Sequence, residues 1–295
     1  MKLTNLKAFN FEGAFRGLRN PMNSWDKSDS IFDIINSNDA DDFYWEVASK
    51  WAEQEGKPNN DELIDKYITW LSKVGCLGYS KYNSHILEIA LIGPKDLELA
   101  RRLIRAGGEH RKFLRQIIVS FDLTAPLYFW KEFDTYKIGT VANSTSTMHK
   151  IATTPITLEC FETDDYKPDL TYLIGVDSSG DSMHSYHLEV KDMVESESIN
   201  TYYEPTIIQF LEELRVKYNK TKDKRYWKEL IRWLPEGWLQ TRTITMSYEN
   251  IFNIIRQRSN HKLSEWNWLI EQFKQLPYSY ELLYSHIETE DSNEN

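Results

Sequence analysis

Apolar side chains recur every three or four residues along much of this chain, the spacing that places them on one face of an α-helix. The clearest stripe consists of Leu63, Ile64, Tyr67, Ile68, Leu71 and Val74. Gly75 follows it as a stop signal, Asp41 or Asp42 can cap an earlier helix, and Ser247 can cap a later one. The pattern predicts helices over residues 41–55, 61–74, 95–106, 125–136, 205–218, 225–233, 247–258 and 264–276.

Strands are predicted where apolar residues run together without helical spacing. Residues 85–92 and 117–123 are two such runs, and both are typical of buried strands. The runs 170–176 and 185–190 flank a glycine-containing loop, Asp177–Asp181, which indicates a β-hairpin.

Two polar stretches show no period. Residues 10–29 mix Gly, Arg, Asn and aromatic residues and predict an ordered loop. Residues 137–151 are rich in Ser and Thr and predict a second loop. The whole pattern favours an α+β fold, a mainly helical body with a small central sheet. We expect a helical N-terminal region (1–80), a core (81–158 and 205–280), an inserted acidic hairpin segment (159–204) and a disordered tail (288–295).

Composition excludes several classes of protein. The chain has 295 residues, and 14% of them are aromatic, which a disordered chain would not show. Its two cysteines, Cys76 and Cys160, are far apart, which excludes a disulfide scaffold and a cysteine-based zinc site. No apolar run reaches the ~20 residues of a membrane span, and residues 1–10 lack the apolar core of a signal peptide. We therefore expect a cytoplasmic protein without a membrane partner.

The net charge of −10 is concentrated in one segment. Residues 159–204 hold twelve acidic and two basic residues, so this segment alone carries a charge of −10, equal to the net charge of the whole chain. Duplex nucleic acid is not expected as a direct partner, because phosphate binding needs a basic face. A phosphate-bearing small molecule remains compatible with the neutral remainder.

The strongest candidate for chemistry is the polar loop after the predicted strand 117–123 and helix 125–136. Lys137, Asn143, Ser144 and Ser146 offer a cation, an amide and hydroxyls, which suit a phosphate or a nucleotide. An ordered connection, with Ser and Thr bonded to the local backbone, is the alternative. His184 and His187 form the one close histidine pair; we predict no metal site, because a solvated hairpin explains the pair better.

The order of these elements resembles the flavin-dependent thymidylate synthases, in a divergent form. Gly107–His110 is similar to a histidine-containing turn before the first core strand of that family, and Lys137 with 143–146 is similar to its signature loop. Residues 234–235, 241–245 and the helix ending at Arg258 resemble its C-terminal core. The resemblance implies FAD as a candidate cofactor, a pyrimidine deoxynucleotide as ligand and a homo-tetramer. It assigns cofactor binding to His110, Lys137, Asn143, Ser144 and Ser146, and substrate binding to Arg242 and Arg258.

The catalytic signature of the family is incomplete here. Its loop opens Arg-His-Arg, whereas this chain has Thr135, Tyr136 and Lys137. Lysine keeps a charge but not the bidentate fork of arginine. The arginine that follows a glutamate in the last helix of the family is also absent, since Trp266 and Asn267 follow Glu265. The catalytic residues are therefore not assigned.

Two classes of function follow from these observations. The first is a flavin-dependent thymidylate synthase-like protein that binds a pyrimidine nucleotide and FAD, with or without catalysis. The second is a binding protein without catalysis. Because stretches such as 11–29 and 125–150 resemble bacteriophage and prophage proteins of Gram-positive bacteria, that role would be counter-defence. Its partner would be a host immune complex, for example a Gabija-type nuclease complex, and the acidic segment could cover a basic surface there.

Overall fold

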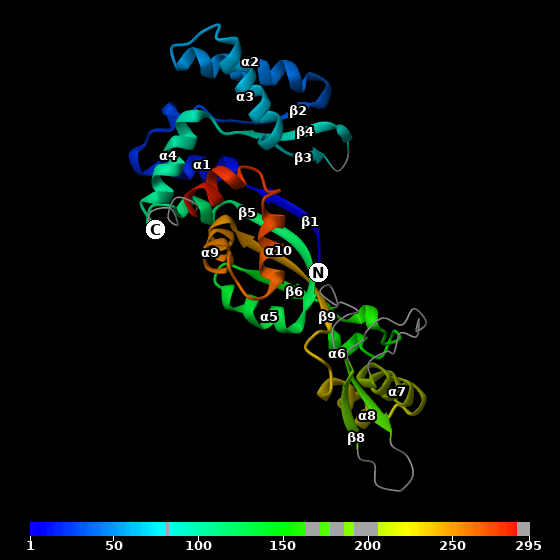
Figure 1. The fold of residues 1–295 in the computed structure, drawn as a ribbon. Coiled ribbons are helices and arrows are strands. Elements are labelled where there is room, and N and C mark those ends of the chain that lie inside the picture. The colour runs from blue at the N-terminus through cyan, green and yellow to red at the C-terminus, as the bar shows by residue number, and fades with distance from the viewer. Residues whose placement is uncertain (81–82, 163–171, 178–185, 192–205, 288–295) are drawn as a thin grey trace. The chain divides into compact units, whose positions relative to one another are not determined.

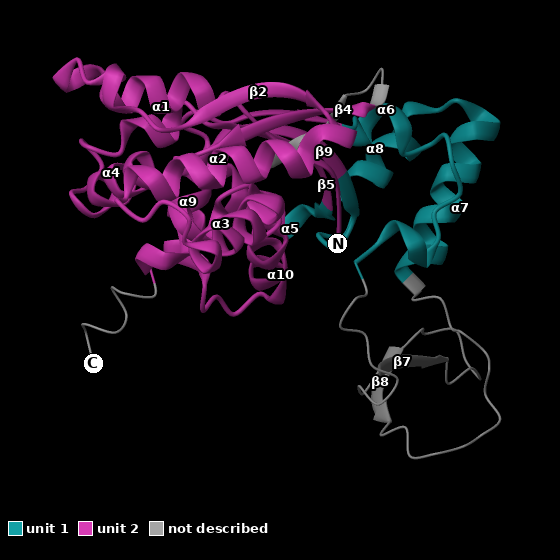
Figure 2. Ribbon diagram, turned by 90° about the horizontal axis from the view of Figure 1, so that it is seen from above, with its two compact units in different colours: residues 1, 125–128, 145–240 teal, residues 2–124, 129–144, 241–295 magenta. Residues whose placement is uncertain are grey.

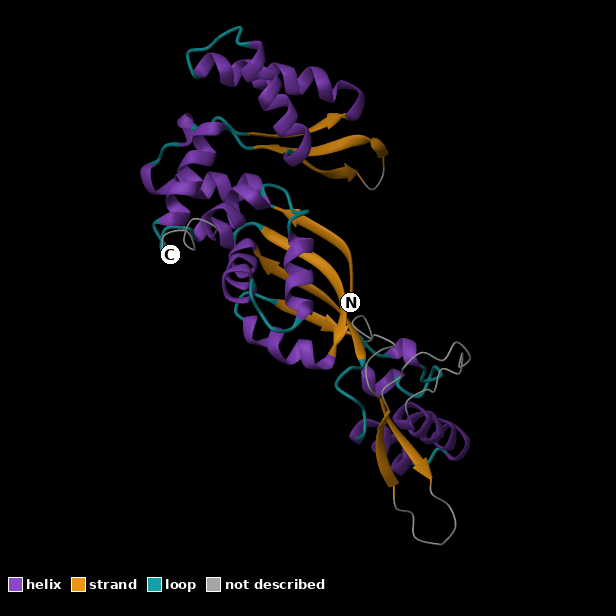
Figure 3. Ribbon diagram, in the orientation of Figure 1, coloured by secondary structure: helices purple, strands orange, loops and turns teal. Residues whose placement is uncertain are grey.

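The structure, a computed structural model, describes residues 1–80, 83–162, 172–177, 186–191 and 206–287. The chain forms two compact units, coloured separately in Figure 2. Unit 1 consists of residues 1, 125–128 and 145–240, and unit 2 consists of residues 2–124, 129–144 and 241–295. Both contain helices and strands (Figure 3), so the predicted α+β class is confirmed.

A four-stranded sheet lies in the middle of unit 2. Its strands follow the order β1 (Lys2–Phe9), β5 (Ile118–Pro126), β9 (Leu239–Ser247) and β6 (Val141–Ser144). Burial alternates along β5, which buries Val119, Phe121 and Leu123. The helices α9 (Tyr248–Arg258) and α10 (Ser264–Phe273) lie across this sheet in Figure 1, and the ring of Phe273 packs edge-on against that of Phe121 at 5.6 Å.

A three-stranded sheet in the same unit has the order β2 (Ile31–Asn36), β4 (Asn83–Leu91) and β3 (Cys76–Ser80). The helices α2 (Ala40–Gln54) and α3 (Asp61–Val74) cover one of its faces (Figure 1). Their shared core consists of Ala40, Tyr44, Val47, Trp51, Leu71, Leu87, Ile89 and Leu91. Burial of this apolar area is what holds the two helices on the sheet.

Buried hydrogen bonds connect the C-terminal segment to this smaller sheet. The hydroxyl of Tyr278 donates to the carbonyl of Ala90 at 2.6 Å and accepts from the amide of Ile92 at 2.9 Å. A π-helical turn, Tyr280–Tyr284, follows. Burial raises the pKa of the Tyr278 phenol, so the hydroxyl stays protonated and can keep donating.

The helix α4 (Pro94–Arg105) begins against a buried aspartate. The carboxylate of Asp29 accepts from the amides of Lys95 at 2.8 Å and Asp96 at 3.1 Å, so it caps the first turn. The backbone carbonyl of Asp29 accepts from the indole of Trp51 at 2.9 Å. Burial raises the pKa of Asp29, and the two amides oppose that effect.

Unit 1 is smaller and has its own core. Its helices are α6 (Thr147–Lys150), α7 (Thr206–Thr221) and α8 (Lys224–Arg232), and it contains the antiparallel hairpin of β7 (Tyr172–Asp177) and β8 (Tyr186–Lys191). The core consists of Ile151, Ile156, Phe161, Ile208, Leu211, Leu214 and Leu230. The predicted hairpin is therefore confirmed, whereas its turn and His184 lie outside the described residues.

Most predicted helices and both predicted strands are confirmed within a few residues of their limits. The predicted loop 10–29 is wrong, because residues 11–19 form α1 (Phe11–Arg19), which buries Phe11, Phe15 and Leu18 at helical spacing. The predicted helix 125–136 begins later, since Ala125 and Pro126 end β5 and α5 spans Leu127–Phe133. The predicted loop 137–151 contains β6 and α6. The segment boundaries proposed from sequence stay a prediction.

Within the helices of the described residues, none is both long and apolar enough to cross a bilayer.

We predict that Gly93→Ala destabilises unit 2. A Cβ at this position would lie 2.2 Å from the carboxyl carbon of Asp29 and 2.5 Å from its backbone oxygen. The cap on α4 would have to move, at a cost of about 1–3 kcal/mol in the free energy of unfolding. Gly108→Ala is the matched control, because nothing lies within 4 Å of its added Cβ. Urea unfolding of both variants tests this, and equal stability would contradict the account.

Candidate functional site

The polar loop residues lie on an exposed edge of the four-stranded sheet. The strand β6 pairs antiparallel with β9, so that Asn143 lies opposite Thr243 and Ser144 lies opposite Arg242. All four residues of β6 are exposed, and so is Lys137. The structure thus brings Lys137, Asn143, Ser144 and Arg242 to one edge of unit 2.

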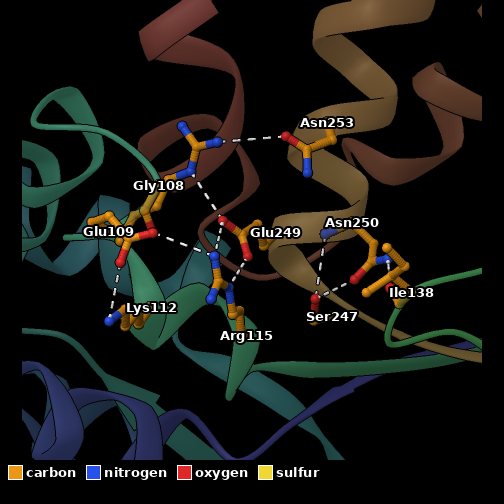
Figure 4. A network of polar contacts seen from close by, with 10 residues as sticks. Gly108, Glu109, Lys112, Arg115, Ile138, Ser247, Glu249, Asn250 and Asn253 are labelled. Atoms are coloured by element: carbon orange, nitrogen blue, oxygen red, sulfur yellow. Dashed lines mark hydrogen bonds and ion pairs between the residues drawn. The ribbon is translucent and has the colours of Figure 1, made fainter. Parts of the chain in front are cut away.

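The turn that leads into β6 is held by the start of α9. The side-chain amide of Asn250 donates to the carbonyl of Ile138 at 2.8 Å (Figure 4). It also donates to the hydroxyl of Thr140 at 3.2 Å. Gly139 takes the left-handed backbone conformation, φ 73°, in this turn. Ser247 caps α9 as predicted, accepting from the amide of Asn250 at 3.3 Å. The backbone next to Lys137 is therefore anchored, while its side chain is exposed.

Arg242 is already engaged by groups of unit 2. Its guanidinium pairs with the carboxylate of Asp134 at 2.7 Å and lies over the ring of Trp130, 4.3 Å from the centroid. Its side chain is 15% exposed, so most of the group is covered. Charge pairing and cation–π contact together fix the orientation of this arginine.

Arg258 has a similar environment at the end of α9. Its Nε donates to the hydroxyl of Tyr136 at 3.1 Å, and its terminal nitrogen donates to Glu132 Oε2 at 3.1 Å. The guanidinium also lies 5.0 Å from the ring centroid of Trp266. Both arginines assigned to substrate binding are thus paired with a carboxylate and stacked on an indole.

Glu132 connects three elements through one carboxylate. Its Oε2 accepts from Arg258, accepts from the indole nitrogen of Trp266 at 3.0 Å and lies 3.4 Å from Nε2 of His261. Sequence patterns do not mark Glu132 or Asp134 as site residues. Each is separated from its arginine by more than 100 positions, so no local pattern marks the pairing.

Ser146 does not join the edge cluster. It belongs to unit 1, where its hydroxyl accepts from the amide of His149 at 3.3 Å and contacts the ring Nδ1 at 2.6 Å. It therefore caps the short helix α6. For this residue the structure supports the alternative in which Ser bonds to the local backbone.

His110 is exposed in the turn after α4. The ion pairs of this turn are made by Arg111 and Arg115. Glu249, in the first turn of α9, pairs with Arg111 at 3.3 Å and also with Arg115 (Figure 4). Asn253 accepts from Arg111 at 3.5 Å, and the Arg111 guanidinium lies 4.4 Å from the ring centroid of Phe252. The turn of His110 and the turn of Lys137 thus both contact the first turn of α9.

Electrostatics reinforce these contacts. The hydrogen bond that Arg115 donates to the Glu249 carboxylate raises the pKa of Arg115. On the sheet, the hydroxyl of Thr243 and the amide of Asn5 donate to the carboxylate of Asp122 at 2.6 Å each and lower its pKa. The charged forms are therefore the stable ones here. No group of three or more His, Cys, Asp or Glu side chains suited to a metal ion occurs among the described residues.

Comparisons with known proteins give similar solved structures. No protein-family model matches, and no curated protein matches. The chain is similar to a solved structure of the flavin-dependent thymidylate synthase ThyX of Helicobacter pylori with FAD and dUMP, at 19% identity and a TM-score of 0.41, over 65% of this chain and 82% of that one. A second structure of that enzyme with FAD and dUMP gives 16% identity and a TM-score of 0.42, over 88% and 98%.

We predict that Glu249→Gln lowers the free energy of unfolding by about 1–3 kcal/mol, because it leaves the largely buried Arg111 without its carboxylate partner. Glu109→Gln is the control, since that carboxylate is 85% exposed and pairs only with Lys112 at 3.3 Å among the described residues. Chemical unfolding of the two variants measures the difference. A larger effect of the control would contradict the structural role of Glu249.

Proposed function

We propose that this chain is a divergent flavin-dependent thymidylate synthase-like protein that binds a pyrimidine deoxynucleotide and FAD at the edge formed by β6 and β9. The observation that carries the proposal is that Lys137, in the anchored turn before β6, and Asn143 and Ser144, on β6, are all exposed at one edge of the sheet, with Ser144 opposite Arg242. An ammonium, an amide and a hydroxyl are donors that phosphate oxygens accept from. Ser146, which caps α6 in unit 1, stays a prediction from the sequence, and the proposal does not depend on it.

The residues present fit a phosphate group. Lys137 would supply the charge. Asn143 and Ser144 are neighbours on a strand and face opposite sides of the sheet, so one of the two would direct a hydrogen bond to a phosphate oxygen. FAD, when bound, would supply redox chemistry, whereas the protein would supply orientation and charge. Asp134 holds the side chain of Arg242, and Glu132 holds that of Arg258. The two arginines would therefore line the site in a fixed orientation.

The proposal is tested by the visible absorbance of the purified chain mixed with FAD, and by thermal unfolding with FAD and with dUMP. We expect a flavin absorbance band that stays with the protein through gel filtration, and a higher Tm with each ligand, because binding to the native state stabilises it. Lys137→Met should weaken FAD or dUMP binding about tenfold. Lys7→Met is the matched control, since Lys7 is exposed on β1, the opposite edge strand.

A colourless protein whose Tm moves with neither FAD nor dUMP would overturn the proposal. Equal weakening by Lys137→Met and Lys7→Met would place binding away from β6.

A second candidate function is protein binding without catalysis, as a phage counter-defence factor against a host immune complex. The observation that favours it is the internal pairing of both assigned arginines, which reduces their attraction for a substrate anion. Unit 1 also exposes large apolar side chains, among them Phe210 and Trp233, and the acidic segment 159–204 precedes them in sequence. Exposed apolar side chains beside acidic ones are typical of an interface with a basic partner.

Deletion of residues 162–202 distinguishes the two functions. Protein binding through this segment predicts loss of capture of the host complex, with the Tm of the remaining fold unchanged. Nucleotide binding at β6 predicts that FAD and dUMP still bind to the shortened chain. Retained capture by the shortened chain would exclude the acidic segment as the docking surface.

A further inference from the structure

A cationic cleft lies on unit 2, apart from the residues of the proposed nucleotide site. It has a volume of about 220 Å³ and is lined by Arg19, Lys27, Lys95, Glu98, Leu99 and Arg102. Four of these side chains are cationic and one is anionic, and the buried carboxylate of Asp96 pairs with Arg19, which leaves a local charge of +2 in a chain whose net charge is −10. A concentration of like charge is costly unless a counter-charge accompanies it, so this cleft calls for an anion.

One wall of the cleft is a single face of α4. Lys95, Glu98, Leu99 and Arg102 follow the spacing i, i+3, i+4 and i+7, which places their side chains next to one another. Lys95 Nζ donates to the side-chain oxygen of Gln54 at 3.3 Å, which positions that ammonium. The other wall comes from Arg19, the last residue of α1, and from Lys27.

Arg19 is the fixed part of the cleft. Its Nε pairs with Asp96 Oδ1 at 2.6 Å, and the side chains of the two residues are 7% and 0% exposed. The carboxylate of Asp96 is itself held, because its other oxygen accepts from the hydroxyls of Ser28 at 2.5 Å and Ser30 at 2.6 Å. This support orients the guanidinium before any ligand arrives, which lowers the entropic cost of binding.

Arg19 also keeps donors for a ligand. A guanidinium has five N–H groups in a planar fork. Within the described part of the chain, only Nε of this side chain has a hydrogen-bond partner. A buried, preoriented arginine beside three further cations is an arrangement that suits phosphate recognition, because the planar fork supplies geometry and the other cations supply charge.

We infer that this cleft binds a small phosphate-bearing anion with the size and charge of a diphosphate group. Arg19 would direct hydrogen bonds to one phosphate, and Lys27, Lys95 and Arg102 would neutralise the remaining charge. Glu98 would oppose the anion. It would also limit the cleft to small ligands with a high density of negative charge, because weaker anions would not offset its repulsion. The inference does not depend on the proposed function, since no lining residue belongs to the β6 edge.

Isothermal titration of the full-length chain with pyrophosphate tests the inference, with ADP in a parallel arm. We expect saturable binding of pyrophosphate that weakens at least tenfold in the double variant Lys27→Gln/Arg102→Gln. This variant leaves the Arg19–Asp96 pair intact. The control is Lys66→Gln/Lys73→Gln, which removes the same two charges from exposed positions on α3 and should change the affinity less than twofold.

A gain of affinity provides a readout that misfolding cannot imitate. Glu98→Gln removes the carboxylate from the cleft, so we expect pyrophosphate to bind about threefold more tightly. ADP that binds as tightly as pyrophosphate, or more tightly, shows that the phosphates of a nucleotide can enter the cleft. ADP that fails to bind assigns the cleft to the free anion.

Absence of saturable pyrophosphate binding would overturn the inference. Equal weakening in the cleft variant and in the α3 control would also overturn it, because the binding would then reflect overall charge. Neither result concerns FAD or dUMP at the β6 edge, so failure here and failure of the proposed function are distinguishable.

Discussion

The carboxylate of Glu132 is the interaction on which the candidate site depends. It joins α5 to the end of α9 through Arg258, to α10 through the indole of Trp266, and to the intervening loop through His261. The rings of Phe129 and Phe133 pack against Trp266 at centroid distances of 4.6 and 6.2 Å and cover one side of this junction. A charge-assisted network of this kind is strong when all its members are satisfied and costly when one is lost.

The same network decides what the arginines of the site can do. Arg242 and Arg258 are the residue types that bind anions well, yet each already has a carboxylate and an aromatic face. A substrate anion would have to compete with Asp134 and Glu132 for them. The side chains that stay open for a ligand are those of β6 and Lys137, which are also the weaker and less directional donors. The proposed ligand binding would therefore depend on these side chains and not on the two paired arginines.

The sequence predicts an element best where the apolar spacing and both end signals of that element are present in its own residues. The helix 61–74 has a full apolar stripe with a capping Asn60 and a final Gly75, and the structure reproduces its limits. The helix α1 was missed because Gly13 and Gly17 suggested a loop, although Phe11, Ala14 and Phe15 already keep helical spacing. The strand β6 was missed because all four of its residues are exposed; its existence depends on pairing with β9 about 100 residues later.

The candidate site was predictable in its residue types but not in its partners. Resemblance and chemistry pointed to Lys137, Asn143, Ser144, Arg242 and Arg258, and the structure places these on unit 2. No local pattern indicated that Glu132 of α5 would pair with Arg258, because tertiary packing brings these two distant positions together. Ser146 lies in unit 1, where it caps α6, and its role in cofactor binding stays a prediction.

The most direct test of this account is a double-mutant cycle between Glu132 and Arg258, measured as free energies of unfolding of Glu132→Gln, Arg258→Met and the double variant. If the Glu132 carboxylate anchors α9 to α5 through this pair, the two residues should be coupled by about 0.5–3 kcal/mol. Additive effects, with a coupling energy near zero, would contradict the account and would leave Arg258 available to bind a substrate anion.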